Sequence, residues 1–318
     1  MFYIEDTELR KRFLKDNNIP IKIVISPYFE ERLELFNRYY KADDAIEEFH
    51  KIYSTIGNRE KYFELYNKVK DDIITYLNSS PEMIFFSQKE DMNKFSVKHK
   101  NLPKNSIYKP TNDGKTFISL DMKSANFTAL KHYNPSIVKN KETYSDFVKE
   151  FTDIDYFAKS KYIRQVVFGN INPARQITYE KYLMDLVLTE LEKIINIETV
   201  VAFQNDEIVI DVSNNILDKT SFDNTIQEIK KTITLLNDEG INLKLELFKL
   251  KKIQNTDGYI KEMLPGSDTL ETVFKGFTTI EFPFVLRKYF NEELKDSDFV
   301  FLHEDKLAKL LEPIEITL

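Results

Sequence analysis

Two short apolar runs near the middle of the chain constrain its fold most strongly. They are VVAF at 200–203 and IVID at 208–211, and four polar residues separate them: Gln204, Asn205, Asp206 and Glu207. β-Branched runs flanking a short polar stretch predict a hairpin with the polar residues at its turn. Asp is a common turn residue, but carboxylates at strand ends can also hold a metal ion. The stretch alone leaves both interpretations open.

The elements around this hairpin predict an α+β protein. A strand is expected at Thr116–Met122, after the turn Asn112-Asp113-Gly114, and another in INLKLELFKL at 241–250. The expected helices are 43–77 (broken near Gly57–Asn58), 142–165, 174–195 and about 221–237. The order strand, helices, hairpin, helix, strand predicts an antiparallel sheet with helices packed on one face.

Three regions follow from composition and pattern. Residues 1–105 are expected to be a helical N-terminal region, and residues 106–255 hold the sheet. Residues 256–318 turn acidic and Phe-rich and are treated as a small C-terminal appendage. Its aromatic residues are expected to be core, with docking of a protein partner as the alternative. They are Phe274, Phe277, Phe282, Phe284 and Phe290.

Composition excludes several kinds of site. There is no cysteine, the four histidines are scattered, and the seven glycines form no nucleotide-cradling loop. No apolar run approaches the roughly 18 residues that cross a bilayer, and the charged start MFYIEDTELRKRF does not resemble a signal peptide. We therefore expect a soluble intracellular protein that neither spans a membrane nor is secreted. Heavy use of Lys, Asn, Ile, Tyr and Phe hints at a phage, viral or other A/T-rich source.

The net charge of −7 argues against a protein that coats nucleic acid. It does not exclude a local basic groove. Basic clusters occur at 94–109, 159–164 and 247–252, and each could equally be solvated surface.

Two aspartates end neighbouring candidate strands. Asp121 ends the strand TFISLDM, and Asp206 lies at the hairpin turn. Carboxylates so placed could share a pair of Mg²⁺ or Mn²⁺ ions that promote phosphoryl transfer. The alternative is that Asp206 is a turn residue and Asp121 caps a helix.

The segments between these acids resemble three motifs of the family A (polymerase I-like) DNA polymerases. SIYKPTNDGKTFISLDMKSANFTAL resembles the family's first palm motif and its lead-in. Arg164-Gln-Val-Val-Phe168-Gly169 resembles part of the finger helix, and Gln204-Asn205-Asp206-Glu207 resembles the third motif, Q-V-H-D-E. The resemblance covers about residues 106–253. It implies a polymerase-like palm, short finger helices within about 135–180 and a reduced, thumb-like N-terminal region.

The resemblance also implies residue roles. Asp121 and Asp206 would be catalytic metal ligands, and Glu207 an accessory catalytic carboxylate. Nucleotide would be bound by Lys161, Arg164, Phe168 and Asn126, and primer–template by Asn172, Arg175 and Gln176 of a segment similar to N-x-P-x-Q. Lys161, Arg164 and Phe168 share one helix face.

The chain also departs from the family pattern. Ser160 stands at the aligned arginine position, and Lys123 and Ser124 replace Ser and Gln. Asn126 replaces the glutamate that excludes a ribose 2′-hydroxyl, and the finger insertion is short.

The sequence therefore predicts a template-directed nucleotidyltransferase that uses Mg²⁺ or Mn²⁺, nucleoside triphosphates and a primer–template in DNA replication. One alternative is an inactive polymerase-derived factor that binds nucleic acid or protein. The other is a template-independent terminal transferase or primase-like enzyme.

Overall fold

The computed structural model describes residues 4–88, 94–214 and 219–318. In this part of the chain a six-stranded sheet has the order β2-β3-β1-β4-β5-β6, and every pairing is antiparallel. Its strands are β1 (Thr116–Met122), β2 (Val200–Phe203), β3 (Glu207–Asp211), β4 (Leu243–Lys252), β5 (Tyr259–Met263) and β6 (Val273–Lys275). A separate two-stranded sheet contains β7 (Val300–His303) and β8 (Lys306–Lys309). The expected α+β class with an antiparallel sheet is confirmed.

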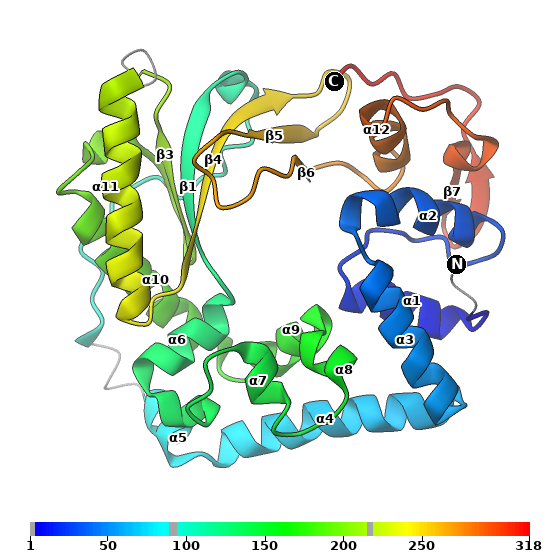
Figure 1. Cartoon of the computed structure of the whole chain (residues 1–318), viewed down its shortest axis with the longest axis horizontal. Coiled ribbons are helices and arrows are strands. Elements are labelled where there is room, and N and C mark those ends of the chain that lie inside the picture. Colours follow the sequence, from blue (N-terminus) through cyan, green and yellow to red (C-terminus); the bar gives the residue numbers. More distant parts are fainter. Residues whose placement is uncertain (1–3, 89–93, 215–218) are drawn as a thin grey trace.

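The helices make up most of the rest of the chain, and Figure 1 shows that the elements are arranged as a ring. The helices are α1 (Thr7–Asp16), α2 (Tyr28–Tyr40), α3 (Asp43–Ile56), α4 (Arg59–Ser79), α5 (Pro81–Phe86), α6 (Ala125–Tyr133), α7 (Tyr144–Val148), α8 (Asp155–Lys159), α9 (Lys161–Gly169), α10 (Pro173–Leu191), α11 (Lys219–Asp238) and α12 (Phe282–Tyr289). The sheet lies on one side of the ring, α1 to α3 lie on the other, and α4 runs between them. No helix in the described ranges is both long and apolar enough to span a membrane.

The alternation of side chains along β1 separates the two faces of the sheet. Ile118, Leu120 and Met122 are buried in the larger core, with residues of α10 and α11. Phe117 points to the opposite face, where it packs with Phe248 and a smaller cluster. Asp121 has the same parity as Phe117, so it lies on the face opposite the helices.

Several predicted boundaries are confirmed. The strand at Thr116–Met122 is β1, and the hairpin at 200–211 is β2 and β3. The long helix breaks at Gly57, which ends α3 with a φ of 80°, and Asn58 caps α4. The expected helix over 142–165 is instead divided into α7, α8 and α9. A new helix begins at Lys161 because the backbone of Ser160 is not helical and its hydroxyl accepts a hydrogen bond from the Ile163 amide.

The C-terminal region is continuous with the sheet. β5 pairs with β4 and β6 pairs with β5, so the expected boundary at 255/256 falls between two paired strands. The five phenylalanines are buried or packed against the core, as expected. Residues beyond β6 pack on the N-terminal helices: the buried Arg32 of α2 donates hydrogen bonds to the carbonyls of Ser297, Asp298 and Val300. The two ends of the chain thereby close the ring.

A buried carboxylate joins the N-terminal helices to α9. Asp16 at the end of α1 is 3% exposed and accepts hydrogen bonds from the hydroxyls of Tyr66, Tyr156 and Ser160. Burial raises the pKa of Asp16 to about 6, although these hydrogen bonds act in the opposite direction. Because Ser160 also caps α9, the position of α9 depends on α1.

We expect Asp16→Asn to have a lower free energy of unfolding than wild type, and we expect this difference to become smaller as pH rises from 5.0 to 7.5. The folded protein takes up a proton on Asp16 near pH 6, whereas the unfolded chain does so near pH 4, so wild type gains stability on acidification through this window. The amide variant has no proton to take up there, and the gain that it lacks is about 1 kcal/mol. Urea unfolding of both proteins at both pH values measures it, and an equal difference at the two pH values would contradict the assignment.

Candidate functional site

The pairing of β1 with β3 brings Asp121 and Asp206 to the same end of the sheet. Asp121 lies opposite Glu207 in the register, and the Met122 amide donates a 2.8 Å hydrogen bond to the Asp206 carbonyl. The turn that carries Asp206 is therefore fastened to the end of β1. The structure brings together the two expected metal ligands and the accessory carboxylate Glu207.

The side chains of Asp121 and Asp206 lack direct partners in the described part of the chain. Neither side-chain carboxylate accepts a hydrogen bond or forms an ion pair within the described part of the chain. Burial is the largest cause that raises the pKa of Asp121 to about 6, and the negative charge of Asp206 is the next largest. The two half-buried acids are thus held close enough for their charges to repel.

The other acids on this face of the sheet are held by protein groups. Glu207 accepts a 2.6 Å hydrogen bond from Ser119, and its carboxylate lies 3.9 Å from the Lys261 amine. Glu246 forms 2.8 Å ion pairs with both Lys244 and Lys261. Burial alone would raise the pKa of Glu246, but the two lysines together lower it below its usual value. An added cation is therefore expected to bind Asp121 and Asp206 rather than these two glutamates.

A further buried acid, Glu180 on α10, lies beside the aspartates. It is 4% exposed and accepts a 2.5 Å hydrogen bond from the side-chain amide of Asn126. Burial, followed by the charge of Asp206, raises the pKa of Glu180 to about 7. Asn126, expected to contact nucleotide, is thus engaged with Glu180 at the edge of the acidic site.

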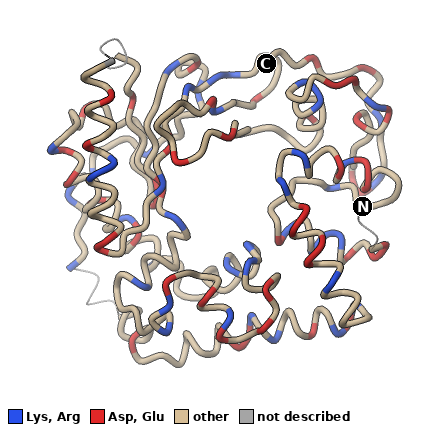
Figure 2. The backbone as a smooth tube through the Cα atoms, viewed as in Figure 1, with Lys and Arg blue, Asp and Glu red and all other residues tan. Residues whose placement is uncertain are grey.

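Helix α9 supplies positive charge next to the acids. Arg164 donates a 2.9 Å hydrogen bond to Ser124, in the turn that follows Asp121 and Met122. Burial, with the charges of Arg164 and Lys275, lowers the pKa of Lys161, so these three cations lie near one another. Figure 2 shows basic positions on α9 toward the centre of the ring, and Lys275 comes from β6. This arrangement suits a polyphosphate bound between α9 and the sheet.

Lys181 of α10 supports the turn that carries Asp206. Its amine donates hydrogen bonds to the carbonyls of Phe203 (2.6 Å) and Gln204 (3.2 Å), and it lies 3.4 Å from the centroid of the Phe203 ring. These contacts fix the backbone that enters the turn.

The remaining expected contact residues take different positions. Phe168 is 2% exposed and packs 6.0 Å from the Tyr144 ring centroid, so its ring belongs to the core. Asn172 caps α10, and Gln176 is 1% exposed and donates to the Ile171 carbonyl. Arg175 is half-buried, and its guanidinium has no hydrogen-bond or ion-pair partner among the residues that the structure describes. The structure therefore leaves Arg175 available but encloses Phe168 and Gln176.

The carboxylates of this site could hold Mg²⁺ or Mn²⁺ only together with other ligands. Within the described ranges, no three His, Cys, Asp or Glu residues are arranged to hold a metal ion. Mg²⁺ in phosphoryl-transfer sites is commonly bound by one or two carboxylates, with waters and substrate phosphates completing the shell. Asp121 and Asp206 provide two such carboxylates, so the residues fit an ion that is bound together with a nucleotide.

Sequence reasoning missed six charged residues of this site: Glu180, Lys181, Lys244, Glu246, Lys261 and Lys275. A sequence signal existed for Lys244 and Glu246, because their alternation along β4 places them on the polar face. The others are positioned by tertiary contacts between elements that are distant in sequence.

No protein-family model matches this chain, and no curated protein sequence matches it.

Proposed function

We propose that this chain is a nucleotidyltransferase that extends a nucleic acid strand on a template, as a reduced and diverged relative of the family A polymerases. One observation carries the proposal: the carboxylates of Asp121 and Asp206, which have no hydrogen-bond or ion-pair partner in the described part of the chain, lie at the end of β1 that Arg164 of α9 contacts through Ser124. In this proposal the six-stranded sheet is the palm, α7 to α9 are short fingers, and residues 1–105 are a reduced thumb.

The proposed chemistry is phosphoryl transfer. The 3′-oxygen of a primer forms a bond to the α-phosphorus of a nucleoside triphosphate, the bond from that phosphorus to the β-phosphate oxygen breaks, and pyrophosphate leaves. The hydroxyl proton passes to solvent. A divalent cation on Asp121 and Asp206 would supply activation of the hydroxyl and stabilise the charge on the leaving oxygen.

The protein residues position the reactants around that step. Arg164 and Lys161 bind phosphate oxygens, and the Arg164 guanidinium can do so with two parallel hydrogen bonds. Lys181 keeps the Asp206 turn in place, while Glu207 stays bonded to Ser119 and contributes negative charge. Each contact acts through positioning and electrostatics, which dominate catalysis of phosphoryl transfer.

A second candidate function is a polymerase-derived factor that binds without catalysis. The enclosure of Phe168 and Gln176 favours it, because neither side chain is available to a nucleotide or a duplex in this structure. In that case the palm is retained as a scaffold.

Incorporation assays with Mg²⁺ or Mn²⁺ test the enzyme directly. Wild type is expected to extend a primed template, and Asp121→Asn and Asp206→Asn should each lower the rate by about 100-fold or more, a loss typical when a charge-stabilising group is removed. Asp211→Asn is the matched control because Asp211 is on the same face of β3 at the far end, bonded to Ser213.

Primed and unprimed DNA and RNA should all be included as substrates. Extension of unprimed strands without a template would favour the terminal transferase or primase-like alternative. No incorporation on any substrate would contradict the enzyme and leave the binding factor as the better candidate.

Thermal unfolding with Mn²⁺ and a non-hydrolysable nucleoside triphosphate tests the ligand set without turnover. We expect the two ligands together to stabilise wild type more than either alone, since substrate phosphates complete the metal shell. At ten times the dissociation constant the gain is about 1.4 kcal/mol.

This gain should disappear in Asp121→Asn and shrink in Arg164→Ala. Arg59→Ala is the control, because Arg59 is exposed at the start of α4 and pairs weakly with Asp6. Equal stabilisation of wild type and Asp121→Asn would show that the cation binds elsewhere.

A further inference from the structure

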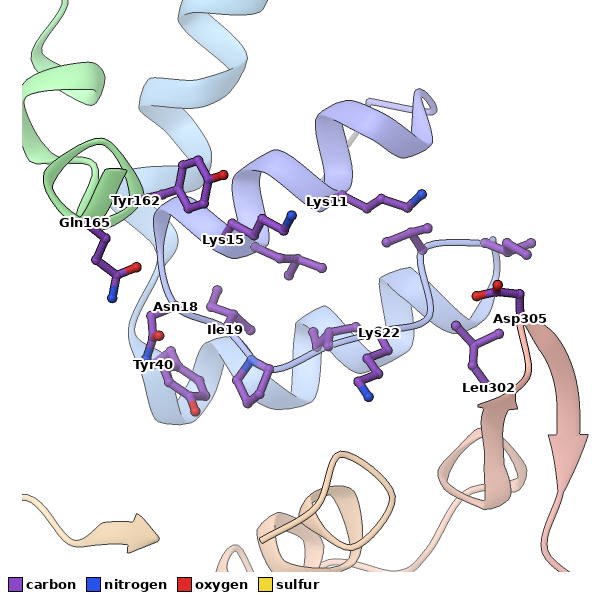
Figure 3. Close-up of a pocket in the computed structure, with 15 residues that line it drawn as sticks. Lys11, Lys15, Asn18, Ile19, Lys22, Tyr40, Tyr162, Gln165, Leu302 and Asp305 are labelled. Atoms are coloured by element: carbon purple, nitrogen blue, oxygen red, sulfur yellow. The ribbon is translucent and has the colours of Figure 1, made fainter. Parts of the chain in front are cut away.

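A large hollow lies on the other side of α9 from the acidic site. Its volume is about 970 Å³, and it is bounded by α1, the segment 18–25, α9 and the β7–β8 turn. Figure 3 shows Lys11 and Lys15 along one side and Lys22 on the opposite side, with Tyr162 and Gln165 of α9 at one end. This volume is at the upper end of the range for small-molecule sites, so it exceeds what one nucleotide unit would need.

The rim of the hollow is positively charged. Three of the described lining residues are lysines, and Asp305 is the one acid among them. Lys11 is 52% exposed and pairs with Glu8, which lies outside the lining, while Lys22 has no partner in the described part of the chain. In a chain with a net charge of −7, this concentration of lysines favours an anionic ligand.

Aromatic and amide groups occupy the end next to α9. The ring of Tyr162 is supported by the Arg12 guanidinium, 4.3 Å from its centroid, and the Lys15 amine lies 5.7 Å from the same centroid. Figure 3 shows the side-chain amides of Asn18 and Gln165 at this end, with Tyr40 beyond Asn18. A supported aromatic ring offers a stacking surface to a base, and amides can hydrogen-bond its edge.

The floor between the lysines is apolar. Leu14, Ile19, Ile21 and Val24 line it and are each buried for most of their surface. An apolar floor with an aromatic end and a cationic rim matches unpaired bases joined by phosphates. The bases of a duplex are stacked on one another, so their faces could not pack on the apolar floor or on the ring of Tyr162.

We infer that this hollow binds single-stranded nucleic acid, with phosphates on Lys11, Lys15 and Lys22 and a base stacked on Tyr162. No group in the hollow, as far as the structure describes its lining, is committed to a ribose 2′-hydroxyl, so DNA and RNA strands both fit. The inferred binding of a single strand is argued from the residues of the hollow and does not depend on the proposed polymerase function. Only its use as the path of an unpaired template, past the helix that carries Arg164, rests on the proposed function.

Fluorescence anisotropy with a labelled 12-nucleotide oligothymidylate, in chelator, tests the inference apart from catalysis. Wild type is expected to bind this strand, and a ribo-oligonucleotide of the same length, more tightly than a duplex. Lys11→Ala/Lys15→Ala/Lys22→Ala should weaken binding at least tenfold and reduce the salt slope by about 2, because three phosphate contacts on a single strand are lost.

Tyr162→Leu should weaken binding by about 5-fold or more at an unchanged salt slope, since stacking is worth about 1–3 kcal/mol per base. Tyr162→Phe keeps the ring and should bind like wild type. The charge-matched control is Lys61→Ala/Lys68→Ala/Lys231→Ala, on exposed positions of α4 and α11. Circular dichroism melting shows whether each variant is folded.

Asp121→Asn should bind the strand like wild type, so loss of polymerase activity and loss of strand binding are separate results. The inference is overturned if the variant with Lys11, Lys15 and Lys22 replaced binds the strand as tightly as the control variant with three other lysines replaced. It is also overturned if a duplex binds equally well through the same lysines. A third contradicting result is displacement of the strand by polyglutamate as effectively as by unlabelled oligothymidylate.

Discussion

The register of β1 against β3 is the constraint on which the candidate site depends. Ile118, Leu120 and Met122 pack in the larger core with the helices, while Phe117 packs in the smaller cluster on the opposite face, and this division fixes which face carries Asp121. A shift of one residue would turn Asp121 into the larger apolar core and move Leu120 to the face that carries the charged residues. The hydrophobic pattern that folds the sheet therefore also places Asp121 opposite Glu207 and beside the Asp206 turn.

The charges on that face are compensated unevenly. Lys244 and Lys261 form ion pairs with Glu246, and Ser119 donates a hydrogen bond to Glu207. In the described ranges no group forms a hydrogen bond or ion pair with the carboxylate of Asp121 or Asp206, and the charge of Lys261 only partly offsets the rise in the pKa of Asp121. The raised pKa of Asp121 expresses an electrostatic cost that a purely structural role would not require. Local conflicts of this kind concentrate at functional sites, where an external ligand removes them.

Local signals explain which parts of the fold could be predicted from the sequence. β1, the hairpin and the helix break at Gly57 each follow from a turn or from residue alternation within a few positions. β5 and β6 escaped detection because they are short and charged, and Lys261 is buried only through its pairing with Glu246. Motif spacing likewise pointed to Asp121, Asp206 and Arg164, and the structure places Asp121 and Asp206 at one end of the sheet, with Arg164 bonded to Ser124 nearby. The spacing could not show that Phe168 and Gln176 point into the core, since the packing of α9 on α10 and on Tyr144 decides that.

Helix α9 connects the N-terminal helices to the sheet, because its first turn is bonded to α1 and its side chains contact both neighbours. Ser160 caps it and bonds to the buried Asp16, which Tyr66 of α4 also holds. Arg164 ties it to Ser124 at the end of β1. The N-terminal helices therefore hold α9 in position against the sheet, so the geometry of the candidate site depends on them. Helices α1 and α9 also line the lysine-rich hollow, so the contacts that position Arg164 also determine the shape of the second site.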